Sequence, residues 1–274
     1  ASLIAEDLGM NAELHFGELT PAPSEGQDFS LTMHDFESPV PVHHTTPPML
    51  TPHLDETFEH HQAGDFLLES LLPVDPHDQE VFTTLADVHD VTGVNYVHNT
   101  YGFRGEGQTI AVIDSGIAYD HYSLGAGFGA GHKVVGGYDF TEENDANPYD
   151  DGPSGFHGTH VAGIIGSDHA TYKGVASGAD LVALRVFNDN GDGYFSWVEN
   201  ALQWVHDNRT AFEHEITTVN LSLGTTWNSD SIPGWAMLED EFAQLEADGI
   251  FISVSAGNSF TDYNSPGLSY PAAS

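Results

Sequence analysis

Apolar and polar positions fall into short alternating blocks from about residue 108 to the end of the sequence. The apolar blocks, which predict strands, are residues 109–113, 133–140, 181–187, 217–223 and 250–255. The blocks with helical spacing or helical boundaries are residues 157–166, 196–208 and 237–245. Strands that alternate with helices predict an α/β fold in three layers, with a mainly parallel sheet between the helices. We expect the strands at 109–113 and 250–255 to be buried.

The first 84 residues differ in composition from the rest. They are acidic and rich in proline and histidine, and residues 21–52 show neither a strand period nor a helix period. This predicts a largely disordered tail or linker before a domain at 85–274, with a propeptide as the alternative. Valines at 88, 91, 94 and 97 predict a short helix that leads into the domain.

The charge balance limits the partners of the chain. Five Lys and Arg residues stand against 42 Asp and Glu residues, a net charge of −37 with histidine neutral, which argues against nucleic-acid binding. Only 17% of residues are charged and 39% are hydrophobic, so the domain can still form a core. The chain has no cysteine. No apolar run approaches the roughly 20 residues of a membrane-spanning helix, so we expect no membrane span.

Three polar residues stand where chemistry collects in a parallel sheet, at or just beyond the carboxyl ends of strands or at the start of a helix. Asp114 ends the first domain strand, His157 opens a helix, and Asn258 follows the last strand. Each alone is ordinary, because aspartate often caps a turn and Gly-Asn is a common turn. Together, an acid, a base and an amide donor for an oxyanion fit acyl transfer.

The segments around these residues resemble those of the subtilisin-like serine peptidases, or subtilases. The resemblance covers roughly residues 85–274 and rests on four ordered motifs. They are AVIDSGI at 111–117, HGTHVAG at 157–163, VNLSLG at 219–224 and SAGN at 255–258. The resemblance implies a subtilisin-like fold, incomplete at the C-terminus, and serine endopeptidase activity on polypeptides with no cofactor in the chemistry.

The same resemblance assigns roles to individual residues. Asp114 would orient and stabilise the imidazolium, His157 would be the general base and acid, and Asn258 would donate to the oxyanion. The residues that would line the substrate cleft are Ser222, Leu223, Gly224, Ala256 and Gly257. The backbone of residues 222–224 would pair with an extended peptide by strand addition.

The nucleophile of the family is not found in this sequence. It is a serine in a Gly-Thr-Ser motif, and the Gly-Thr pairs at 158–159 and 224–225 are not followed by serine. We therefore expect the serine to lie beyond Ser274 and the 274-residue chain alone to be inactive. One alternative is a subtilase-like binding or scaffold module without the serine. Another is a metal hydrolase using Asp114, His157 and His160, although no His-Glu-x-x-His glutamate accompanies the histidines.

Two further expectations concern the surroundings of the protein. The loop at 142–151 alternates oxygen ligands and is a candidate for structural calcium, with a merely solvated acidic loop as the alternative. The scarcity of Lys and Arg suits a high-salt environment, where ions screen the repulsion among carboxylates. These features lead us to expect a secreted acidic protein, outside the cell or at its surface.

Overall fold

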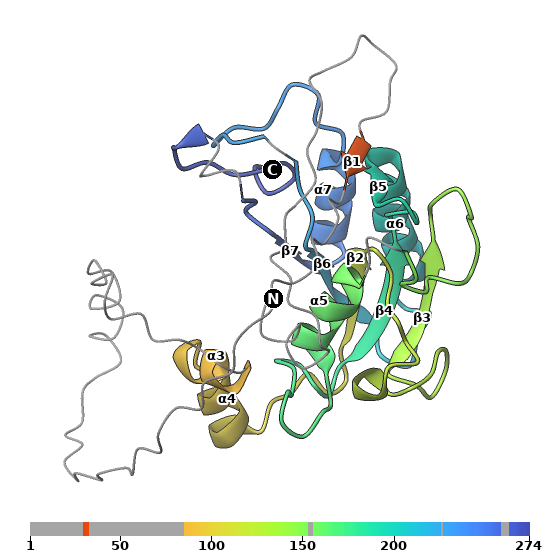
Figure 1. The fold of residues 1–274 in the computed structure, drawn as a ribbon, viewed down its shortest axis with the longest axis vertical. Coiled ribbons are helices and arrows are strands. Elements are labelled where there is room, and N and C mark those ends of the chain that lie inside the picture. Colours follow the sequence, from red (N-terminus) through yellow and green to blue (C-terminus); the bar gives the residue numbers. More distant parts are fainter. Residues whose placement is uncertain (1–29, 33–84, 153–155, 226, 259–262) are drawn as a thin grey trace, which may run out of the picture.

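The computed structural model describes residues 30–32, 85–152, 156–225, 227–258 and 263–274 (Figure 1). Its centre is a five-stranded parallel sheet in the order β3-β4-β2-β6-β7. The strands are β2 (Thr109–Asp114), β3 (Val134–Asp139), β4 (Asp180–Arg185), β6 (Ile216–Leu221) and β7 (Phe251–Val254). The helices between them are α5 (His157–Gly166), α6 (Phe195–Asn208) and α7 (Glu239–Ala247). The predicted α/β fold with a parallel sheet is thus confirmed.

Alternating residues of β2 separate the two helical layers. Ala111 and Ile113 belong to a buried cluster with residues of α6 and α7, whereas Val112 packs in a second cluster with Ala162 of α5. Successive side chains of a strand point to opposite faces, so α5 covers one face of the sheet and α6 and α7 cover the other. Within the described ranges, no helix is both long enough and apolar enough to cross a bilayer.

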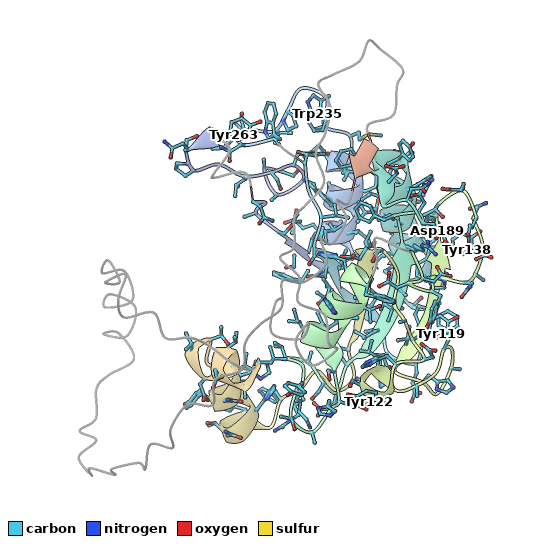
Figure 2. The ribbon with its side chains drawn as sticks, in the orientation of Figure 1. Tyr119, Tyr122, Tyr138, Asp189, Trp235 and Tyr263 are labelled. Carbon is cyan, nitrogen blue, oxygen red and sulfur yellow. The ribbon has the colours of Figure 1, made fainter. Side chains whose placement is uncertain are left out.

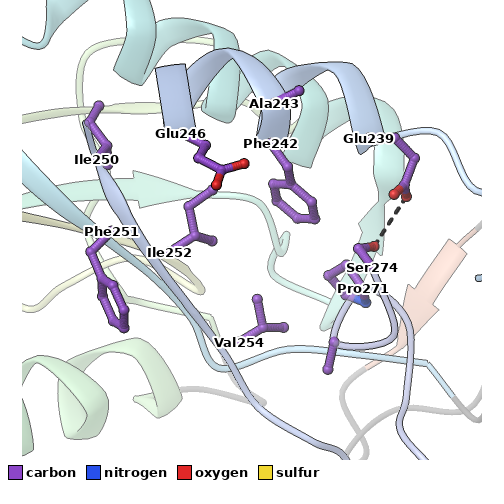
Figure 3. Close-up of a pocket in the computed structure, with 11 residues that line it drawn as sticks. Glu239, Phe242, Ala243, Glu246, Ile250, Phe251, Ile252, Val254, Pro271 and Ser274 are labelled. Carbon is purple, nitrogen blue, oxygen red and sulfur yellow. Dashed lines mark hydrogen bonds between the residues drawn. The ribbon is translucent and has the colours of Figure 1, made fainter. Parts of the chain in front are cut away.

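The last strand departs from the expectation of a buried strand. Phe251 of β7 is 67% exposed, and the three residues after it are only half-buried. The reason is its place in the sheet, since β7 pairs with β6 alone in the part of the chain that the structure describes. A pocket of about 600 Å³ lies between β7 and α7, where Ser274 donates a hydrogen bond to Glu239 (Figure 3).

The helix predicted at the start of the domain differs from the structure. The single valine-spaced helix is wrong: α3 (Leu85–Val91) and α4 (Val94–Tyr101) are separate, because Gly93 between them has a left-handed backbone with φ of 77°. Their buried side chains include His89 and His98, whereas Val91 is 64% exposed.

A short strand lies within the stretch predicted to lack regular structure. This strand, β1 (Ser30–Thr32), pairs antiparallel with β5 (Asp192–Tyr194), which follows β4 and leads into α6. The rest of the predicted tail, residues 1–29 and 33–84, lies outside the described part of the chain.

Candidate active site

Asp114 is placed by the alternation of β2. It shares the strand face of Val112, which packs towards α5, and it is the last residue of the strand, with an exposed fraction of 0%. The backbone N–H of Ser115 donates to its Oδ1 over 2.7 Å. A buried carboxylate therefore ends the strand on the side of the sheet that α5 covers.

His157 is the first residue of α5 and meets Asp114 directly. Its Nδ1 lies 2.7 Å from Oδ1 of Asp114, and its exposed fraction is 6%. Burial by itself would lower the pKa of His157, but the charge and hydrogen bond of Asp114, with the charge of Asp150, outweigh burial and raise it. An imidazole held through Nδ1 by a carboxylate has the orientation that a general base needs.

Two glycines allow the helix to approach the strand so closely. A Cβ atom at Gly158 would stand 2.2 Å from the carbonyl oxygen of Gly116, which is part of the backbone and cannot rotate away. Gly116 itself has φ of 103°, a conformation that side chains disfavour. The first turn of α5 therefore rests directly on the turn that follows Asp114.

A second buried carboxylate accompanies the pair. Asp150 has an exposed fraction of 0% and accepts hydrogen bonds from Phe156 and Thr159, which flank His157. Sequence reasoning had grouped Asp150 with the candidate calcium ligands, and no local pattern distinguishes it from the exposed Asp151 beside it.

The predicted cleft residues lie along the same edge of the sheet. Residues 222–224 follow β6 and residues 256–258 follow β7, so both segments join Asp114 at the carboxyl ends of neighbouring parallel strands. Adjacent strands are about 4.8 Å apart, which places the end of β7 roughly 10 Å from the end of β2. Asn258 is exposed there.

The segments that follow β6 and β7 contact each other and the segment around Ser269. The hydroxyl of Ser255 donates to the carbonyl of Leu223, and the N–H of Ser269 donates to the carbonyl of Ala256. Added Cβ atoms at Gly224 and Gly257 would both collide with Ser269. Leu223, Gly224, Ala256 and Gly257 are thus held together through Ser255 and Ser269, and the pocket beside α7 contains no residue assigned to the cleft.

Several carboxylates of the candidate calcium loop already bind protein donors. Asp151 pairs with Arg185, as does Asp189, which follows β4 (Figure 2), and Glu142 accepts from Asn188. Among the described residues, no group of three or more histidine, aspartate or glutamate side chains is arranged to hold a metal ion. The same finding gives the metal-hydrolase alternative no support. Structural calcium stays a prediction.

His160 is a buried neighbour of the pair. Its exposed fraction is 1%, and neither ring nitrogen has a hydrogen-bond partner among the described residues. Burial, followed by the charges of His157 and His121, lowers its pKa to about 4. His160 is therefore a neutral core residue at neutral pH, and its pKa is shifted in the opposite direction to that of His157.

The site is thus a hydrogen-bonded Asp–His pair at the carboxyl edge of the parallel sheet of an α/β domain. Residues 105–274 match the model of the subtilase family. The chain therefore belongs to the subtilase family.

Curated relatives are about one third identical to it over the aligned residues. It is 32% identical to Subtilisin E of Bacillus subtilis over 176 residues, which is 64% of this chain and 40% of that protein. It is 34% identical to the minor extracellular protease Epr of the same organism, over 63% of this chain and 23% of that protein. The chain thus spans less than half the length of either relative.

One solved structure is also similar. A cold-adapted subtilisin-like serine proteinase has 33% sequence identity and a TM-score of 0.44, over 57% of this chain and 49% of that one.

Proposed function

We propose that this chain supplies the acid–base half of a serine endopeptidase. The observation that carries the proposal is the buried hydrogen bond of 2.7 Å between His157 and Asp114 at the carboxyl edge of the sheet. In this role His157 takes the proton of a serine hydroxyl and returns it to the leaving amine. Asp114 holds the tautomer and stabilises the imidazolium.

The oxyanion donor is the next part of the proposal. The exposed amide of Asn258, at the end of β7, would donate to the negative oxygen of the tetrahedral intermediate. Removing the donor of this kind in subtilisin costs about 3–4 kcal/mol of transition-state stabilisation. We further propose that the nucleophilic serine comes from polypeptide that follows Ser274, because no residue of this sequence stands in a Gly-Thr-Ser motif.

A polypeptide substrate suits the backbone around the site. Residues 222–224 follow β6 at the edge of the sheet where Asp114 lies, and their backbone would pair with an extended substrate. Edge strands bind extended peptides through main-chain hydrogen bonds, and pockets for side chains add the specificity. The extracellular proteases among the relatives support secretion, which we propose for this protein as well.

The test compares the 274-residue chain with a longer polypeptide that includes the residues after Ser274. We expect a fluorophosphonate to label the longer form and not the shorter one. The substitution His157→Ala should abolish labelling, whereas His214→Ala should leave it intact, because His214 forms a similar ion pair with Asp180 at the surface. A long form that binds peptides without being labelled would indicate a binding module instead. Inhibition by a chelator alone would indicate metal chemistry.

Calcium has a separate test. A melting temperature that falls on chelation would support structural calcium in the loop at 142–151. An unchanged melting temperature would remove that hypothesis.

A further inference from the structure

Asp150 occupies an unusual position for an aspartate. It lies in the loop between β3 and α5, seven residues before His157, and no part of it is exposed. Burying a carboxylate is costly unless hydrogen bonds replace its lost water. The bonds that Asp150 makes therefore identify what it does for the fold.

Its first set of bonds holds the start of α5. Oδ1 accepts from the N–H of Phe156 over 3.2 Å. Oδ2 accepts from the N–H and the hydroxyl of Thr159 over 3.0 and 2.6 Å. Phe156 is the N-cap residue, and its own side chain makes no capping bond. Asp150 therefore caps this helix from a distance, and its two anchor points lie on either side of His157.

Its second set of contacts reaches the turn after Asp114. The Ser115 hydroxyl lowers the pKa of the Asp150 carboxyl, and its oxygen accepts from the N–H of Gly158 over 2.9 Å. The Thr159 hydroxyl, which donates to Asp150, accepts from the N–H of Ala118 over 2.9 Å. One carboxylate thus connects the backbone beside Asp114 with the backbone beside His157.

The charge of Asp150 also acts on the pair. Burial is the main cause that raises its pKa to about 6, the bonds from Thr159 oppose the rise, and the charge of Asp114 adds to it. In return, ionised Asp150 contributes to the raised pKa of His157. The imidazole therefore responds to two carboxylates, only one of which touches it.

We propose that Asp150 is a positioning residue for the Asp114–His157 pair, because it ties the first turn of α5 to the turn after β2. The expected effect of Asp150 on kcat rests on the proposed function, whereas its expected effect on the position and pKa of His157 does not. A helix cap with no influence on the pair would affect stability alone. The position and proton affinity of the imidazole distinguish the two roles.

The test uses the 274-residue chain and nuclear magnetic resonance of its histidines. In Asp150→Asn we expect the low-field Nδ1 proton of His157 to weaken or disappear and the pKa of His157 to fall. The matched control is Asp145→Asn, which removes an exposed carboxylate of the same loop and should change neither signal. A folded Asp150→Asn protein with an unchanged His157 proton and titration would overturn the proposal.

A second pair of variants covers the case in which Asp150→Asn does not fold. Thr159→Val removes the hydroxyl that joins Asp150 to Ala118, and Thr159→Ser retains it. We expect the valine variant to perturb the His157 signals and the serine variant to preserve them. Equal signals in both folded variants would contradict the proposal.

In the longer, active polypeptide, Asp150→Asn should lower kcat about ten- to hundredfold with little change in KM, since small misplacements of a reacting group cost about that much. A loss confined to KM would contradict a positioning role. If the parent polypeptide shows no activity, the proposed function fails, while the His157 signals still decide the role of Asp150.

Discussion

His157 and Asp114 are separated by 43 residues in the chain, yet Nδ1 of one lies 2.7 Å from Oδ1 of the other in a buried site. The contact exists because β2 ends on the face that α5 covers and α5 begins at the histidine. It sets the protonation behaviour of the imidazole and is the basis of the first prediction.

Asp114→Asn should lower the pKa of His157, because the variant loses both a negative charge and the acceptor that favours the protonated ring. A histidine titration by nuclear magnetic resonance checks this, with the surface pair of His214 and Asp180 as the internal reference. In an active polypeptide kcat should fall about 10⁴-fold. An unchanged titration of His157 would show that the contact is absent in solution.

Gly158→Ala should destabilise the protein by roughly 1–3 kcal/mol, as overpacking of a tight core site does. The new Cβ would meet the Gly116 carbonyl at 2.2 Å, so α5 has to move away from β2 and carry His157 from Asp114. Chemical denaturation measures the loss. Gly234→Ala is the control, since a Cβ there meets nothing within 4 Å. Equal stabilities of the two variants would refute the close approach.

His160 should make the protein less stable as the pH falls from about 6.5 to about 4. Its pKa is lower in the folded state, so the unfolded chain binds the extra proton in this window and stability rises with pH. His160→Leu removes the effect, so the stability of the variant relative to the parent should increase by about 3 kcal/mol between pH 7 and pH 4.

Comparison with the parent isolates the His160 contribution. Asp150, with its pKa raised to about 6, has the opposite effect, since its contribution to stability is lost as the pH rises to that value. It is present in both proteins and cancels from the difference. A difference independent of pH would mean that His160 is not buried as a neutral ring.

The melting temperature should rise from low salt to molar sodium chloride. A net charge of −37 creates repulsion that ions screen, as the Debye length shrinks from about 10 Å at 0.1 M to about 3 Å at 1 M. Replacing the exposed Asp207 and Asp230 by asparagine should reduce the salt dependence. Sucrose provides a control without charge. A melting temperature that is flat or falls with salt would count against a saline setting.

Much of the fold follows from local pattern. The segments that become β2 and α5 lie within one residue of their predicted bounds. For β2 the reason is that burial on both faces leaves a continuous apolar run in the sequence. The exposure of β7 could not be predicted from its sequence. Its residues are as apolar as those of a central strand, and its exposure comes from its place at the edge of the described sheet.

In the candidate site, too, some residues could be predicted from the sequence and one could not. Asp114, His157 and Asn258 stand out because motifs surround them, and their positions at strand ends or a helix start suggest a common edge. Asp150 does not stand out, because a buried aspartate and an exposed one look alike in an acidic loop. Its importance appears only when the loop folds back against the start of α5.

The sequence by itself determined the order of strands and helices, the motifs at their ends and the excess of acidic residues, since these depend on neighbouring positions along the chain. Tertiary structure decided which strands are neighbours, which carboxylates are buried, and which imidazole has a raised pKa and which a lowered one. Those properties arise from contacts between segments tens of residues apart, where packing and the loss of water set distances and pKa values that no local pattern records.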